Sequence, residues 1–98
     1  MQINAARSDS TLTLSPEGRL DNHSSPELKD TVDNSLEGVT SLVLDLSMVD
    51  YVSSAGLRTL LSVHKQMSER GGMKVTNVKE GVMEILKMTG FVNVLSIE

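Results

Sequence analysis

Residues 42–61 read LVLDLSMVDYVSSAGLRTLL, from Leu42 to Leu61, and this stretch decides the fold. It opens with an apolar run of branched residues, which is typical of a strand. A polar turn with two acids and then two serines follow, and apolar residues return at helical spacing. The order is therefore strand, loop and helix, and the serines fall where the helix begins.

Ser53 and Ser54 are both candidates for the cap of that helix. A capping serine accepts a hydrogen bond from a free backbone N–H of the first turn. The same position lies at the positive end of the helix dipole and suits a phosphate group. Local chemistry alone favours a plain cap, and a phosphorylation site is the sharper alternative.

Composition excludes several classes of function. The 98 residues include 39% hydrophobic but only 2% aromatic residues, so a single aliphatic core is expected. A net charge of −4 and the lack of stacking rings disfavour binding to nucleic acid or to anionic membranes. The absence of cysteine and of a long apolar segment indicates a soluble cytoplasmic protein with no disulfide, thiolate or Cys-based zinc site.

The first half of the chain predicts a hairpin and a helix. Alternating residues up to Leu14 indicate strands, residues 15–18 a turn, and Arg19-Leu20 the returning strand. Ser25 is the expected cap of a helix from Pro26, with an apolar face through Leu36 and a stop at Gly38; the other members of this face are Leu28, Val32 and Val39.

The second half alternates strands and helices. The run 41–46 predicts a central strand covered on both faces, and 54–70 a helix that buries Leu57, Leu60, Leu61, His64 and Met67. A strand over 73–78, a helix over 80–89 closed by Gly90, and a last strand or strand-like tail over 91–97 follow. This order predicts an α/β fold: one domain, residues 1–98, whose mixed sheet has parallel strands in its centre and packs against helices.

The stretch 42–61, with Gly18-Arg19-Leu20-Asp21 upstream and Met88-Thr89-Gly90-Phe91 downstream, resembles the STAS domains of bacterial anti-sigma factor antagonists. The likeness covers nearly the whole chain and implies the same fold. In that family a phosphorylated serine begins a helix just ahead of a Gly-Leu pair, which here is Gly56-Leu57. The resemblance therefore places the phosphate on Ser54, with Ser53 as second choice, because Ser53 and Ala55 depart from the Asp and Ser/Thr that many members carry around that serine.

The resemblance also implies a docking surface for the partner kinase. Asp21 matches the acid of the family's Gly-x-Leu-Asp loop, and further contacts are expected around it and around the serine helix start. The expected partner-binding residues are Asp21, Asn22, His23, Ser24, Asp50, Val52, Ser53, Ala55, Gly56 and Arg58. Without the resemblance, these residues read as ordinary loop and helix-start residues.

Catalytic and metal sites have weaker support. His64 lies about 15 Å along the same helix from Ser54 and cannot act as its base, and residues 53–56 are not a nucleophile elbow. His23 is far from the serines in sequence, so only the folded chain could bring it close to them. A small hydrolase is therefore the least supported of the three functions considered. Asp21, Asp45 and Asp50 lack the spacing of a cation cage, and no phosphate loop occurs, so no cofactor or metal is expected.

The resemblance implies a non-enzymatic switch in transcription regulation. Unphosphorylated, the chain would bind a serine-kinase anti-sigma factor and free its sigma factor. The kinase would use ATP and magnesium to modify Ser54, and a metal-dependent serine phosphatase would reverse the step. The alternative is a non-switching STAS module of a larger assembly, such as a stress-sensing complex or a lipid-transporter subunit, in which the serine is only a cap.

Overall fold

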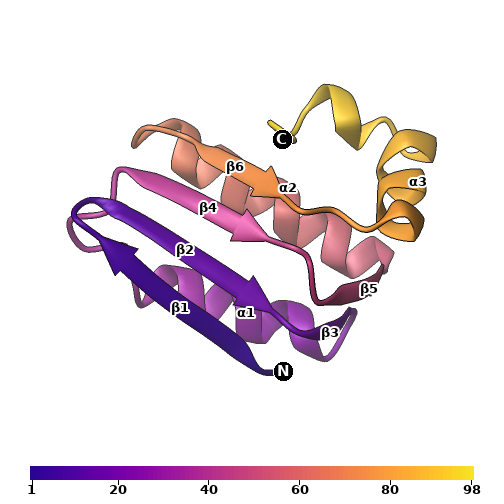
Figure 1. The fold of residues 1–98 in the computed structure, drawn as a ribbon, viewed down its shortest axis with the longest axis horizontal. Helices are drawn as coiled ribbons and strands as arrows, with labels where there is room; N and C mark the ends of the chain where they lie inside the picture. Colours follow the sequence, from indigo (N-terminus) through magenta and orange to yellow (C-terminus); the bar gives the residue numbers. More distant parts are fainter.

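The computed structural model describes all 98 residues (Figure 1). Its strands are β1 (Ile3–Ser8), β2 (Thr11–Pro16), β3 (Gly18–Leu20), β4 (Ser41–Asp45), β5 (Val49–Val52) and β6 (Met73–Thr76). Its helices are α1 (Ser24–Asp33), α2 (Ser54–Ser68), α3 (Glu80–Met88) and the short 3₁₀ helix η1 (Phe91–Asn93).

The strands form a mixed sheet with a parallel centre, as predicted. Four strands follow the order β1-β2-β4-β6, in which β1 is antiparallel to β2 while β2, β4 and β6 are parallel. The chain crosses from β2 to β4 through α1 and from β4 to β6 through α2, since parallel neighbours need such crossovers. β3 and β5 pair in parallel as a separate two-stranded sheet, which the sequence did not predict.

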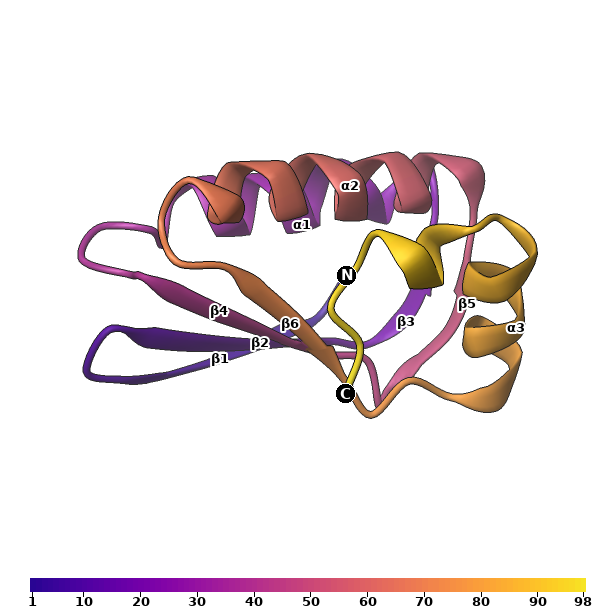
Figure 2. The same ribbon diagram turned by 90° about the horizontal axis from the view of Figure 1, so that it is seen from above.

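The helices α1 and α2 lie side by side over one face of the four-stranded sheet (Figure 2). The third helix, α3, lies beyond one end of this sheet and packs against β5. The prediction that β4 is covered on both faces is therefore wrong. Leu42 and Leu44 are buried on the helix side, whereas Val43 and Asp45 are only half-buried on the other. An apolar run does not show which faces are covered, and the polar neighbours of Val43 on β2 and β6 leave this face to water.

The opening hairpin has a different turn from the one predicted. β1 and β2 are joined at residues 9–10, where Asp9 adopts a φ of 55°, a conformation that aspartate tolerates. After Pro16 the chain does not turn back. Gly18 N donates to the Met48 carbonyl (2.8 Å), and β3 pairs with β5 instead of returning along β2. This pairing carries the end of β3 to the start of α2.

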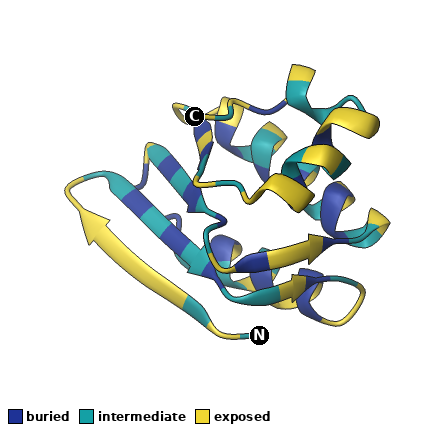
Figure 3. Ribbon diagram, turned by 45° about the vertical axis from the view of Figure 1, so that its right-hand side comes forward, coloured by how far each residue is buried: buried dark blue, intermediate teal, exposed yellow.

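The core is aliphatic, as the composition predicts. Twenty-one buried Leu, Val and Met side chains form one cluster between the sheet and the helices (Figure 3). The predicted apolar face is buried, both in α1 (Leu28 and Val32) and in the segment that follows it (Leu36 and Val39). On α2, Leu57, Leu60 and Met67 are buried as expected, but Val63 fills the place expected for Leu61 and His64, which are half-buried.

The predicted last strand is wrong. Gly90, at a φ of 79°, closes α3 as expected, but the chain then forms η1, because the Phe91 carbonyl accepts from Val94 N and Leu95 N. Only Ile97 pairs with β6, as an isolated bridge to Val75. Buried Leu95 anchors this tail in the core, and two backbone hydrogen bonds with Val75, to the Ser96 carbonyl and from Glu98 N, tie its end to β6.

Candidate functional site

The start of α2 separates the roles of the two serines. Ser53 is the cap: its backbone is extended (φ −85°, ψ 177°), and its Oγ accepts from Gly56 N at 3.2 Å. Its backbone N–H also donates to the Leu20 carbonyl (2.9 Å), which ties the cap to the end of β3. Ser53 is half-buried and its hydroxyl is occupied by the helix.

Ser54 is the first helical residue and is exposed. No hydrogen bond engages its hydroxyl in the structure, so the group is open to solvent and to a modifying enzyme. The structure thus divides the two tasks that the sequence left open between these serines: Ser53 holds the helix, and Ser54 presents a free hydroxyl.

Ser53→Ala is expected to lower the free energy of unfolding by about 1 kcal/mol, because Gly56 N loses its capping partner. Ser54→Ala is the matched control and should change stability by less than about 0.5 kcal/mol, as for an exposed side chain without partners. Urea denaturation of both variants measures the difference. A larger loss for Ser54→Ala would reverse the assignment of the cap.

Asp21 organises the second loop of the site. Its Oδ1 accepts from the backbone N–H groups of His23 (3.0 Å) and Ser24 (3.2 Å) and thereby caps α1. The prediction of Ser25 as this cap is wrong, because α1 begins at Ser24, two residues before the predicted start at Pro26, and the Asp21 carboxylate already accepts from the N–H of Ser24. Ser24 is buried, and its hydroxyl donates to the Arg19 carbonyl (2.5 Å).

The hydrogen bonds from Ser24 N and His23 N lower the pKa of Asp21 below its ordinary value of 3.8. The carboxylate is therefore charged at neutral pH. Because the folded pKa is the lower one, the contribution of Asp21 to stability is complete above pH 3.8 and is lost as the pH falls through the lowered pKa.

The two loops meet at the end of the β3–β5 sheet. Asp21, Asn22, His23 and Ser53 line one shallow pocket of about 270 Å³. The pairing of Leu20 with Val52 places the loops side by side. The structure thus brings together the two motifs that the sequence singled out, which lie some thirty residues apart in the chain.

Arg19 and Tyr51 complete this pocket and were missed by the sequence prediction. The Arg19 guanidinium lies 4.4 Å from the centre of the Tyr51 ring, and its Nε lies 4.0 Å from Asp21 Oδ2. Their position depends on the β3–β5 pairing, for which the sequence holds no local signal. The sequence offers one hint that Arg19 belongs to the site, because it directly precedes Leu20 and Asp21.

The other predicted contact residues differ in their access to a partner. Asn22, His23, Asp50 and Arg58 are exposed, and Asp21 and Ala55 are half-buried. Val52 and Gly56 are buried and support the surface from below. Asp50 is held by Lys79 Nζ of the loop before α3 at 2.6 Å. The surface formed by the predicted contact residues is therefore mixed in charge. Its acids are Asp21 and Asp50, and the positive charges of Arg19, Arg58 and Lys79 lie beside them.

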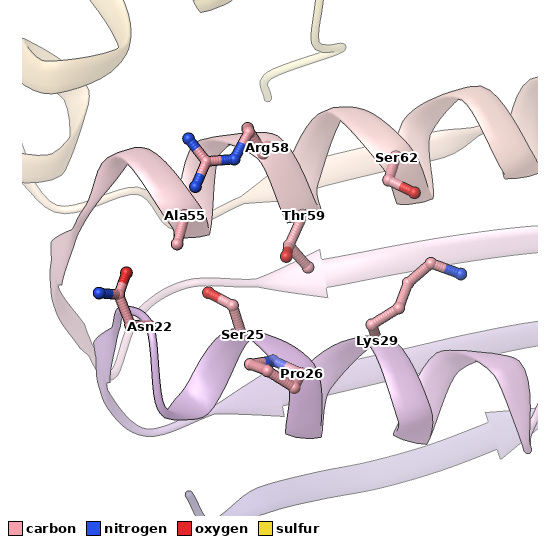
Figure 4. A pocket seen from close by; sticks show the side chains of 8 residues that line it. All are labelled: Asn22, Ser25, Pro26, Lys29, Ala55, Arg58, Thr59 and Ser62. Atoms are coloured by element: carbon pink, nitrogen blue, oxygen red, sulfur yellow. The ribbon is translucent and has the colours of Figure 1, made fainter.

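Arg58, Ala55 and Asn22 also line a groove between the first halves of α1 and α2, which Figure 4 shows from close by. This groove and the pocket with Asp21 lie on either side of Asn22, which belongs to both. Asp45 lines neither: its carboxylate accepts from Ser47 N (2.9 Å) and Asn77 Nδ2 (3.2 Å), which lower its pKa.

The structure forms neither a His–serine pair nor a metal-binding cluster. Neither histidine is hydrogen-bonded to a serine; His64 is half-buried on α2 with its Nδ1 unpartnered. No three His, Cys, Asp or Glu side chains come together in a metal-binding cluster. None of the helices has the length and apolar character needed to cross a bilayer.

Comparison with known proteins identifies the relatives of this chain. The sequence model of the STAS domain matches residues 2–98. BtrV of Bordetella bronchiseptica, provisionally named an anti-sigma factor antagonist, is 37% identical over 62 residues, which are 62% of this chain and 53% of that protein. The anti-sigma F factor antagonist of Paenibacillus polymyxa is 27% identical over 100 residues, covering 99% of this chain and 86% of that protein.

Solved structures of low sequence identity share the fold. An anti-sigma factor antagonist from Mycobacterium paratuberculosis superposes with a TM-score of 0.87 at 21% identity, covering 98% of this chain and 83% of that one. The Bacillus cell fate determinant SpoIIAA, solved in its phosphorylated form, gives a TM-score of 0.75 at 13% identity over 99% and 91% of the two chains. The predicted fold and family resemblance are confirmed, and the relatives are named for a binding role rather than for catalysis.

Proposed function

This chain belongs to the STAS domain family, and from that premise we propose that it is an anti-sigma factor antagonist switched by phosphorylation of Ser54. The unphosphorylated chain binds a serine-kinase anti-sigma factor and frees the sigma factor that this kinase holds. The observation that carries the proposal is the exposed, unbonded hydroxyl of Ser54 beside a helix cap that Ser53 already supplies.

The geometry supports Ser54 over Ser53 as the phosphorylated residue. A kinase needs a hydroxyl that can enter its active site, and of these two serines only Ser54 has a free and exposed hydroxyl. A phosphate on Ser53 would have to fit at a half-buried side chain whose oxygen already accepts from Gly56 N. A phosphate on Ser54 would lie at the positive end of α2, one helical turn before Arg58, so the fold would tolerate it.

The switch acts on the complex rather than on the fold. Phosphorylation adds close to two negative charges at neutral pH and a bulky group of oxygens. Burying these against the kinase costs free energy, because the charges lose water without gaining a matched partner. The phosphorylation of SpoIIAA supports the same modification on this fold. A metal-dependent serine phosphatase would restore the binding form.

The proposal is tested by displacement. The purified chain, free of phosphate, is added to a complex of sigma factor with a serine-kinase anti-sigma factor from the same cell, and the products are separated by size-exclusion chromatography. Release of free sigma factor, with the chain eluting together with the kinase, is the expected result. An intact sigma complex at saturating chain, while a known antagonist of that kinase displaces it, would refute the proposal.

Asp21→Lys is expected to weaken the complex with the kinase by about tenfold or more, because charge reversal at a docking surface costs over 1.4 kcal/mol. Isothermal titration calorimetry measures the dissociation constant. Since the lysine also removes the cap of α1, Asp21→Asn is made in parallel: it keeps the capping oxygen and should weaken binding less.

Glu69→Lys is the matched control for this charge reversal. Glu69 is exposed and follows the last residue of α2, at the opposite end from Ser54. It should leave the dissociation constant nearly unchanged. An affinity of folded Asp21→Lys equal to that of Glu69→Lys would remove Asp21 from the docking surface.

A further inference from the structure

The two edges of the four-stranded sheet differ in how they are covered. At the β6 edge, Val75 N donates to the Ser96 carbonyl (2.8 Å) and Glu98 N donates to the Val75 carbonyl (2.8 Å), so the C-terminal tail covers this edge. At the other edge, β1 pairs with β2 alone, and its residues 4–8 are exposed (Figure 3). An uncovered edge strand presents unpaired N–H and C=O groups, to which another strand can add.

Every second residue of β1 has free backbone groups. Glu17 N donates to the Gln2 carbonyl (2.9 Å), in the register that pairs β1 with β2. Antiparallel ladders alternate between pairs that exchange hydrogen bonds and pairs that do not. The even-numbered residues of β1 therefore bond to β2, and the outward N–H and C=O groups belong to Ile3, Ala5 and Arg7.

β1 lacks the features that commonly block pairing at an edge. It has six residues in an unbroken register, with no proline and no lysine. Its one charged side chain, Arg7, donates to the carbonyls of Asp9 (3.0 Å) and Glu37 (2.8 Å), which hold it against the neighbouring loops. Ala5 and Ala6, at the centre of the strand, are too small to hinder the approach of a second strand.

We propose that β1 pairs with β1 of a second copy of this chain, antiparallel and with Ala5 on the twofold axis. In this register Ala5 bonds to Ala5, and Ile3 bonds to Arg7, of the other copy. All the free groups are then used, in about six backbone hydrogen bonds, whereas a shift by two residues leaves about four. Each arginine faces an isoleucine rather than the other arginine, so the register opposes no like charges.

The symmetry of the free groups favours a second copy over an unrelated strand. They lie evenly on both sides of Ala5, so a twofold contact satisfies both edges at once and joins two four-stranded sheets into one. The contact is closed, because the outer edges of the joined sheet are the covered β6 edges. Since alanines bury little apolar area, we expect a weak, concentration-dependent dimer. β1 contributes no residue to the predicted docking surface, so this proposal stands independently of the proposed switch.

Sedimentation velocity of the chain at concentrations up to about 1 mM tests the pairing, because this range reveals dissociation constants from micromolar to about millimolar. We expect the mean mass to rise with concentration from that of one chain toward that of two. Ala5→Lys opposes two lysines at the twofold axis and should weaken association by about fivefold or more. Ala6→Lys is the matched control, since its lysine would face Asn4 of the other copy. A chain that stays monomeric throughout, or equal association of the two variants, would overturn the proposal.

A disulfide test checks the register, because the chain has no cysteine of its own. In the proposed pairing the two Ala5 Cα atoms lie about 5.5 Å apart, within the span of a disulfide, so Ala5→Cys should form a covalent dimer under mild oxidation. The two Ala6 Cα atoms would lie about 8 Å apart, so Ala6→Cys should cross-link only at the background level that urea-unfolded chain shows. Background cross-linking of Ala5→Cys, or equal cross-linking of both variants, would contradict the pairing.

Discussion

A phosphate on Ser54 is expected to weaken binding to the kinase anti-sigma factor by about a hundredfold, while the melting temperature of the chain changes little. A hundredfold loss corresponds to about 3 kcal/mol, which is in the range for leaving an added charge uncompensated in an interface. The fold is spared because Ser54 is exposed and the first turn of α2 favours negative charge. Calorimetric titration of chemically homogeneous phosphoprotein measures the effect.

Ser54→Asp tests the same account without a kinase reaction. It adds a single charge at the same residue, closer to the backbone than a phosphate would lie, so we expect a smaller loss of affinity, about tenfold. Ser8→Asp is the matched control, since Ser8 is exposed at the far end of β1. Equal affinities of Ser54→Asp and Ser8→Asp would contradict the electrostatic account, as would a large fall in the melting temperature of Ser54→Asp alone.

Gly56→Ala is expected to destabilise the chain by about 2 kcal/mol. A Cβ at this position would lie 2.6 Å from the Leu20 carbonyl oxygen and 2.8 Å from Val52 Cγ1. The carbonyl cannot yield freely, because it accepts from Ser53 N (2.9 Å) and joins β3 to the cap of α2. Overpacking of this kind costs about 1–3 kcal/mol or more, which exceeds the gain of up to about 1 kcal/mol from placing alanine in a helix.

Gly81→Ala provides a control of opposite sign. Gly81 lies in α3, and a Cβ there meets no atom within 4 Å. Alanine should therefore stabilise this helix by up to about 1 kcal/mol. Urea denaturation of both variants gives the comparison. A Gly56→Ala variant as stable as the wild type would show that the contact between β3 and the start of α2 is not tight.

The local elements could be predicted because their signals are local. The strand and the helix of residues 42–61 follow from an apolar run and a return to helical spacing, and the structure has β4 and α2 there, although the expected loop between them contains β5. Gly90 closes α3 as its conformational freedom suggests. The failures are tertiary: the β3–β5 pairing and the open face of β4 depend on neighbours distant in sequence.

The site was predicted in part for the same reason. Asp21 and Ser54 carry motifs that a single segment displays, and the structure confirms that their two loops meet. Arg19, Tyr51 and Lys79 join the surface only through the pairing of β3 with β5 and the packing of α3 on β5. The mixed charge of the surface therefore could not be derived from the acids that the sequence emphasised.

The most direct test of the central claim is the position of the phosphate. The purified chain is incubated with ATP, magnesium and the serine-kinase anti-sigma factors of its own cell, and the product is mapped by mass spectrometry, with Ser54→Ala and Ser53→Ala in parallel. The account predicts a single phosphate on Ser54, lost in Ser54→Ala and retained in Ser53→Ala. Phosphate on Ser53, or none with any kinase that modifies its control substrate, would contradict it.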